Sequence, residues 1–227
     1  MKKLFFSVIA VAIGLGMQAQ FKEGFITYSM NIEGLPPEAQ SMMKGAEMKV
    51  YFKDKKARIE MTNAFVTSTT VADENSSTTT MEQMGQKSYF KMTKAEMEKQ
   101  KEKSKSPEPK ITYTNEKKTI CGYECEKAVI ESKDEKGQDQ KMIAWVTDKL
   151  PNHHHMGNQR GGNHFKNLKG AALEYSMNQG PMKISFLATT VSNAPVPDSK
   201  FVLSTDGYTE IKYDDMKKMQ GMGGGGQ

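Results

Sequence analysis

Apolar and polar residues alternate along much of this chain, which is the pattern of β-strands with one buried face. In the segment 24–32 (GFITYSMNI), apolar residues occupy every second position. The segments 47–53 and 56–62 flank Asp54 and Lys55, so a tight hairpin is expected there. Further strands are expected over 64–72, 76–84 and 87–92. The first half of the chain therefore predicts a meander of consecutive antiparallel strands.

The stretch 118–147 contains both cysteines and the only tryptophan, and it is expected to be the centre of the domain. Two apolar runs of β-type residues, 128–130 and 142–146, are separated by the polar, glycine-bearing link 132–140. This pattern predicts a strand, a loop and a strand, with a further strand over 110–114 leading into them. After this hairpin, strands are expected over 170–177, 182–191 and 201–204.

The alternation of apolar and polar residues stops in the charged segment 93–105, and this segment predicts the main helix of the chain. Thr93 can cap its first turn, and Glu96 follows three residues later, as in a capping box. The proline-containing segment 106–109 ends it. Only two of its residues are apolar, so we expect a solvated excursion rather than a core element. A short helical segment is also expected over 38–44.

Composition limits the classes of protein that fit. A chain of 227 residues with 37 % hydrophobic content can bury one good core, so we expect a single domain over 20–213. The mean hydropathy of -0.66 argues against an integral membrane protein. The net charge is +5, or 5 − 2 = +3 without the two lysines near the N-terminus. This weak excess, with no basic stripe between aromatic residues, does not fit a nucleic-acid-binding protein.

Residues 1–19 predict a cleavable signal peptide. Lys2 and Lys3 precede an apolar run over 4–15, and small or polar residues follow before Gln20. The run is shorter than the roughly 20 residues that cross a bilayer. No cysteine lies near the cleavage site, so a lipid-modified N-terminus is not expected. We therefore expect a periplasmic or secreted protein without a membrane span after removal of the signal.

Export to an oxidising compartment makes Cys121 and Cys125 candidates for a disulfide. In a straight strand their Cα atoms would lie roughly 13 Å apart, whereas a disulfide needs about 7 Å or less. A bridge therefore requires a turn at 122–124, which Gly122 permits. Three intervening residues distinguish the pair from the redox-active Cys-x-x-Cys motif. The alternative is that both are small apolar side chains in the core.

All four histidines lie in or beside the polar loop 152–164. Imidazole suits zinc and copper, so one interpretation is a metal site. The other is a mobile loop, because consecutive residues cannot easily all face one ion and no acidic or thiolate side chain adjoins them. The candidate ligands are His153, His154, His155 and His164. No cofactor is expected, and the Met/Gly-rich tail 214–227 is expected to be disordered.

A distinctive set of residues occurs in order between Cys121 and Leu173: Gly122, Tyr123, Cys125, Lys127, Ala128, Ala144, Trp145, Leu150, Pro151, Gly170 and Leu173. This order resembles exported bacterial domains of unknown function of the GLPGLI type and its relatives. The ending from Val196 to Tyr208 is also similar to theirs. The GLPGLI signature itself is absent, with NLKGAALE over 167–174 in its place, which favours a sister family.

This resemblance implies a fold like that of the periplasmic lipoprotein carriers of the Lol type. Their fold is mainly β (α+β), a curved antiparallel sheet or half-open β-barrel around an apolar cavity, with short covering helices. The number of expected strands agrees with such a shape, because a long meander must curl to hide one apolar face.

These expectations favour an exported, non-catalytic binding protein that carries or senses a lipid or another apolar ligand in the cell envelope. The eighteen methionines suit this role, because thioether side chains adapt to irregular apolar guests. They could equally fill a core, and the sequence does not identify which residues line a cavity. A zinc- or copper-binding envelope protein is the second hypothesis. An envelope hydrolase is the third, although none of the common catalytic motifs occurs.

Overall fold

The computed structural model of the chain describes residues 22–103, 108–133, 137–153, 164–179, 182–213 and 215. Its helices are α1 (Pro37–Met42), α2 (Lys94–Lys103) and the 3₁₀ helix η1 (Asp198–Phe201). Its strands are β1 (Glu23–Glu33), β2 (Glu47–Lys53), β3 (Lys56–Thr62), β4 (Val66–Ala72), β5 (Ser76–Gln83), β6 (Gln86–Thr93), β7 (Lys110–Ile120), β8 (Tyr123–Lys133), β9 (Asp139–Thr147), β10 (Ala171–Gln179), β11 (Met182–Ser192) and β12 (Thr209–Glu210). The expected signal peptide and almost all of the tail 214–227 lie outside the described residues.

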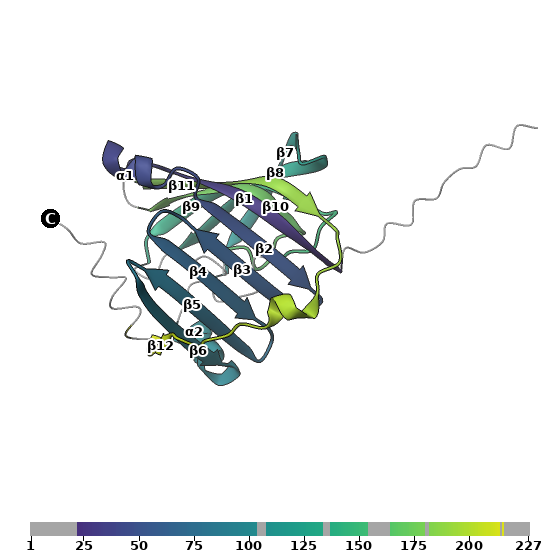
Figure 1. Cartoon of the computed structure of the whole chain (residues 1–227). Coiled ribbons are helices and arrows are strands. Elements are labelled where there is room, and N and C mark those ends of the chain that lie inside the picture. Colours follow the sequence, from purple (N-terminus) through teal and green to yellow (C-terminus); the bar gives the residue numbers. More distant parts are fainter. Residues whose placement is uncertain are drawn as a thin grey trace, which may run out of the picture.

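All the described strands belong to one sheet, in the order β12-β6-β5-β4-β3-β2-β1-β11-β10-β9-β8-β7. Neighbours are antiparallel except for β12, which is parallel to β6. Figure 1 shows the sheet bent, with β2–β6 forming one wall and β9–β11 another. β1 joins the two walls, because it pairs with β2 on one side and with β11 on the other. The prediction of a curved, mainly antiparallel sheet with short helices is confirmed.

The hairpins of the first half follow the predicted pattern. Asp54 and Lys55 form the turn between β2 and β3, and Asp54 has φ 50, which aspartate tolerates better than most residues. Ile26 and Tyr28 on β1 are buried, as the alternation predicted. The helical segment expected over 38–44 is present as α1.

The first turn of α2 is a capping box, as predicted from Thr93 and Glu96. The backbone N–H of Thr93 donates to Oε2 of Glu96 at 2.8 Å, and the N–H of Glu96 donates to Oγ1 of Thr93 at 3.3 Å. Two backbone donors that have no partner within the helix are thereby satisfied. The side chains described along α2 are mostly exposed, which confirms the expected solvated helix.

The predicted central hairpin is present as β8 and β9, where Ala128 pairs with Ala144 and Ile130 with Met142. The sequence did not reveal that β7 extends to Ile120 and forms a second hairpin with β8. The turn between them contains Cys121 (φ 49) and Gly122 (φ 82). Two consecutive residues with positive φ are typical of a two-residue type I′ turn.

The C-terminal segment does not form the strand expected over 201–204, and that prediction is wrong. The segment instead crosses the outer face of β2–β5 and reaches β6, where Thr209 and Glu210 form β12 (Figure 1). Lys53 donates to the carbonyl oxygen of Val196 at 3.2 Å, and Arg58 donates to that of Lys200 at 3.1 Å. Strands β2–β5 are already paired on both sides, so an apolar run lying on them has no free ladder to join.

Chain packing is tight where the connection between β9 and β10 returns to the sheet. The backbone N–H of Ala171 donates to the carbonyl oxygen of Leu150 at 3.1 Å. A Cβ atom on Gly170 would lie 2.0 Å from the carbonyl oxygen of Thr147 and 2.9 Å from the Cα of Asp148. Only glycine fits this close approach of two backbone segments.

Candidate functional site

The concave face of the sheet is the candidate site, and its residues follow from the cross-strand register. Residues directly opposite one another on neighbouring strands point to the same face. One row across β1–β6 is Tyr28, Met48, Met61, Ser68, Met81 and Ser88. The next row is Ile26, Val50, Ile59, Thr70, Thr79 and Phe90. The third row, Gly24, Phe52, Ala57, Ala72, Ser77 and Met92, lies towards the opposite rim.

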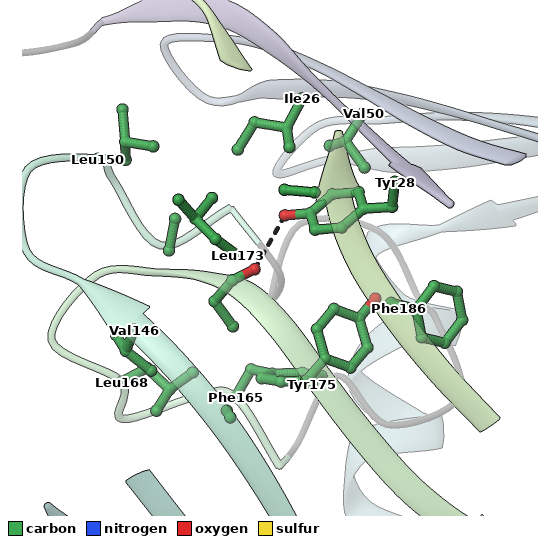
Figure 2. Packing of buried hydrophobic residues seen from close by; sticks show 14 of the residues in the cluster. Ile26, Tyr28, Val50, Val146, Leu150, Phe165, Leu168, Leu173, Tyr175 and Phe186 are labelled. Carbon is green, nitrogen blue, oxygen red and sulfur yellow. Dashed lines mark hydrogen bonds between the residues drawn. The ribbon is translucent and has the colours of Figure 1, made fainter. Parts of the chain in front are cut away.

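The middle of the concave face is filled by a continuous apolar cluster. Tyr28, Met48 and Val50 from β1 and β2 are almost fully buried there. Tyr175 on β10 and Phe186 on β11 face them from the other wall, with their rings stacked at a centroid distance of 4.7 Å. Figure 2 shows Tyr28 and Val50 together with Tyr175 and Phe186 in this cluster. The core of the domain is therefore inside the bend of the sheet.

Part of the cover over this cluster comes from the connection between β9 and β10 rather than from a helix. Leu150, Phe165 and Leu168 of this connection are buried in the cluster (Figure 2). The ring of Phe165 meets Tyr175 edge to face at 5.0 Å between centroids. The side-chain amide of Asn152 donates to the carbonyl oxygen of Phe165 at 2.7 Å, which joins the two ends of the connection.

A polar contact lies inside the apolar cluster, around the hydroxyl group of Tyr28. This hydroxyl donates to the carbonyl oxygen of Ala172 at 3.0 Å, drawn as a dashed line in Figure 2. Nε2 of His153 lies 3.4 Å from the same hydroxyl oxygen. Burial raises the pKa of Tyr28 well above its usual value, so the phenol stays protonated and can donate.

His153 is a core residue, although the sequence placed it in a polar loop. Its side chain is 2 % exposed, and its ring stacks on Phe52 with an interplanar angle of 6° and 5.3 Å between centroids. Nδ1 lies 3.2 Å from the carbonyl oxygen of Pro151. Both ring nitrogens thus face oxygen atoms of the protein.

His164 lies in a different environment from His153. Its Nδ1 is 2.7 Å from Oγ of Ser132 on β8, and burial lowers the pKa of its imidazole. His154 and His155 lie outside the described residues. Within the described residues, no group of three or more histidine, cysteine, aspartate or glutamate side chains could hold a metal ion. The structure does not bring His153 and His164 together on a common site.

The predicted disulfide between Cys121 and Cys125 is not formed in the structure, and both residues are free thiols. Cys121 is at the tip of the β7–β8 hairpin, where its thiol donates to the carbonyl oxygen of Ala188 at 3.3 Å. Cys125 is two residues along β8 from Tyr123, roughly 7 Å farther down the strand. The turn ends before the chain could bring Cys125 back to Cys121. Burial raises the pKa of Cys125 to about 11.

The concave face changes character towards β4, β5 and β6. Inward-facing positions there carry hydroxyl groups, and Oγ1 of Thr70 lies 2.9 Å from Oγ1 of Thr79 across the β4–β5 pair. Most side chains in this part are partly exposed, unlike those in the filled centre. The partly exposed ones are Ser68, Thr70, Thr79, Met81, Ser88 and Phe90, and Met61 beside them on β3 is partly exposed as well.

A separate hollow of about 300 Å³ opens at the rim, between the tips of the β3–β4 and β5–β6 hairpins. Phe65 and Met84 border it and are 39 % and 82 % exposed. Its lining also includes Glu82, whose carboxylate contacts Lys87 and the hydroxyl of Tyr208. The hydrogen bond from the Tyr208 hydroxyl lowers the pKa of Glu82 most strongly, and Lys87 lowers it further. One wall of the hollow is therefore charged.

Sequence reasoning missed two features of this site. The hydroxyl-bearing inner positions of β4 and β5 are visible in the sequence as serine and threonine at alternate residues, but the segments 64–72 and 76–84 were used only to predict strands. The burial of His153 had no local signal, because the chain must return from β9 to cover the cluster before the ring is enclosed.

Within the described part of the chain, no helix is long and apolar enough to span a membrane.

Comparison with solved structures finds likeness at low identity. The lipoprotein LppX of Mycobacterium tuberculosis is 11 % identical, with a TM-score of 0.39 over 76 % of this chain and 88 % of that one. LprF of Mycobacterium bovis is 12 % identical, with a TM-score of 0.31 over 79 % of this chain and 90 % of that one. A domain from Vibrio parahaemolyticus, provisionally named as an outer membrane lipoprotein-sorting protein domain, is 8 % identical. Its TM-score is 0.23 over 81 % of this chain and 90 % of that one.

Comparison with protein families gives a specific match. No curated protein matches the chain significantly. Residues 30–193, which contain β2–β11 and the last four residues of β1, match the model of a domain of unknown function, DUF4412. A relationship to the GLPGLI type stays a prediction. Because the match covers well over half of the chain, this protein belongs to the DUF4412 family.

Proposed function

We propose that this protein is an exported, non-catalytic binding protein that carries or senses a lipid or another apolar ligand in the cell envelope. The observation that carries the proposal is the concave face of β3–β6. Its three rows contain no charged side chain, they are continuous with the apolar core, and much of their surface is still partly exposed. A surface of this kind gains free energy when it is covered by an apolar molecule.

Charged residues on the same strands all belong to the other face. On β3, Arg58 and Glu60 point outward and pair with each other at 2.6 Å, while Ile59 between them points inward. On β6, Lys87 and Lys91 point outward between inward-facing Ser88 and Phe90. A sheet that only needed solubility could place charges on both faces of its partly exposed strands, so this segregation favours a function for the inner face.

Methionine side chains at the border between core and exposed surface support an adaptable site. Met48 is buried, whereas Met61 directly opposite it on β3 and Met81 on β5 are partly exposed. Thioether chains can change rotamer at low cost and follow the shape of a guest. A ligand could thus extend the apolar cluster towards β5 without disturbing Tyr28 or Val50.

The test is binding of a fluorescent fatty-acid analogue to delipidated protein, with one inward and one outward variant. Met61→Lys places a charge on the concave face and should weaken binding by about tenfold or more. Thr62→Lys adds the same charge one residue later on the outer face, opposite Glu47, and should leave binding unchanged. Thermal unfolding of both variants checks that they fold. Saturable binding that neither variant changes would place the ligand elsewhere, and no binding at all would refute the proposal.

A further inference from the structure

The hydroxyl groups on the concave face indicate what kind of polar group the ligand carries, an inference that rests on the proposed function. Ser68 and Thr70 on β4 and Thr79 on β5 lie in adjacent rows of the face, and all are partly exposed. A sheet that only packed against an apolar core would favour valine or isoleucine at such positions, because these residues fill a pleated surface without a polar atom.

Thr70 and Thr79 retain hydrogen-bonding capacity after bonding to each other. Each hydroxyl has one proton to donate and two lone pairs to accept. Their mutual bond of 2.9 Å uses one donor and one acceptor, so the pair still offers one proton and three lone pairs. This combination suits a ligand hydroxyl, which both donates and accepts. An anionic phosphate or carboxylate oxygen, which only accepts, can use the one proton but none of the three lone pairs.

The charges around the face lead to the same conclusion. None of the residues in the three rows is lysine, arginine or histidine. Along β5 and β6, Glu82, Lys87 and Lys91 lie on the outer face. Proteins that hold phosphate groups normally use arginine, lysine or a helix N-terminus. Among the residues of the three rows, an anionic headgroup would find no cationic partner to offset the hydration that it loses, which costs free energy.

We infer that the ligand is a neutral amphiphile whose hydroxylated polar end lies on β4 and β5, while its apolar part extends along Met61 towards the cluster. The hydroxyl groups lie on β4 and β5, and Met61 on β3 lies between them and the buried Met48 on β2. An acylglycerol has this distribution of polarity, whereas a free phosphorylated lipid does not.

The experiment compares two ligands with the same oleoyl chain, 1-monooleoylglycerol and 1-oleoyl-lysophosphatidic acid, by isothermal titration calorimetry on delipidated protein below their critical micelle concentrations. We expect 1-monooleoylglycerol to bind about tenfold tighter or more, because the added phosphate has no counter-charge on the face. Equal or tighter binding of the phosphorylated lipid would overturn the inference and leave the proposed function standing. Failure of both ligands, and of methyl oleate, would refute the proposed function itself.

A double variant tests the location. Thr70→Val with Thr79→Val keeps the shape of both side chains and should weaken 1-monooleoylglycerol binding about fivefold, the factor for one net hydrogen bond of ~1 kcal/mol. Binding of methyl oleate, which has no hydroxyl, should not change. Thr67→Val on the outer face of β4 is the matched control. If the double variant binds 1-monooleoylglycerol like the unmodified protein, the polar end does not lie on these strands and the inference is wrong.

Discussion

The hydroxyl group of Tyr28 lies 3.0 Å from the carbonyl oxygen of Ala172, a residue 144 positions later in the chain. Ala172 is next to a register shift in the β9–β10 pair, where Leu173 has no partner opposite it. The phenol thus supplies a hydrogen bond at a place where the regular ladder is interrupted. One side chain from β1 therefore helps to fix the irregular start of β10.

Tyr28→Phe should lower the free energy of unfolding by about 1 kcal/mol or more, because it removes this donor from a buried carbonyl group. The ring remains, so the loss is not one of packing. Urea unfolding followed by fluorescence measures the change. Tyr89→Phe removes an exposed hydroxyl that contacts Glu210 and should cost clearly less. Equal losses of unfolding free energy in the two variants would show that the buried Tyr28 hydrogen bond stabilises the protein no more than the exposed Tyr89 contact.

Gly170→Ala should destabilise the protein by about 3 kcal/mol or more, because a Cβ atom there would overlap the carbonyl oxygen of Thr147. The backbone of one of the two segments would have to move. The thermal midpoint and urea unfolding of the variant would measure this. Glu174→Ala, in the adjoining strand β10 and partly exposed, is a control for general sensitivity of this part of the sheet. A Gly170→Ala variant as stable as the control would contradict the close approach.

Thiol labelling distinguishes the free cysteines of the structure from the disulfide that export favours. In folded protein purified without reductant, Cys121 should react with iodoacetamide because it is exposed, although burial raises its pKa and slows the reaction, and Cys125 should react only after unfolding. Burial, which raises the pKa of Cys125 to about 11, keeps that thiol protonated and unreactive at neutral pH. Mass spectrometry would count one label in the folded state and two in denaturant. No label in either state would establish the bridge instead.

The stability of the protein should fall between neutral and mildly acidic pH because of His164. Burial lowers the pKa of this imidazole in the folded state, so the unfolded chain binds the proton more readily. The free energy of unfolding therefore decreases as pH drops below about 6.5, the unperturbed value. Urea unfolding at several pH values should show this slope, and His164→Asn should reduce it. An NMR midpoint of His164 above 6.5 would contradict the expected direction.

Much of the fold was predictable because each strand of a sheet with one buried face alternates apolar and polar residues along the sequence. The alternation around Tyr28 identified β1 and its inward positions, and Thr93 with Glu96 marked the start of α2 correctly. Such signals depend only on residues close together in the sequence. The run 201–204 shows the limit, since its β-propensity is real but every strand beneath it already has two partners.

The site was less predictable, because it depends on which segments meet across the bend of the sheet. His153 looked like part of a polar loop, and only the return of the chain against Phe52 makes it a core residue. The turn at Cys121 was also hidden, since a cysteine at φ 49 is an uncommon choice for such a position. The alternating hydroxyls near Thr70 were readable, but their meaning depends on the charge-free face around them.

The pairing of β1 with β11 has a consequence for how the molecule is assembled. Phe25 pairs with Ser192, a separation of 192 − 25 = 167 residues, whereas most other neighbouring strands are joined by short turns. The strands β1–β6 can pair with one another as soon as they are synthesised, and so can β7–β11. The β1–β11 pair between these two halves requires both ends of the domain to be present. Closing such a distant contact is slow compared with forming hairpins. We therefore expect each half of the sheet to form its own strand pairs before the first strand joins the two halves.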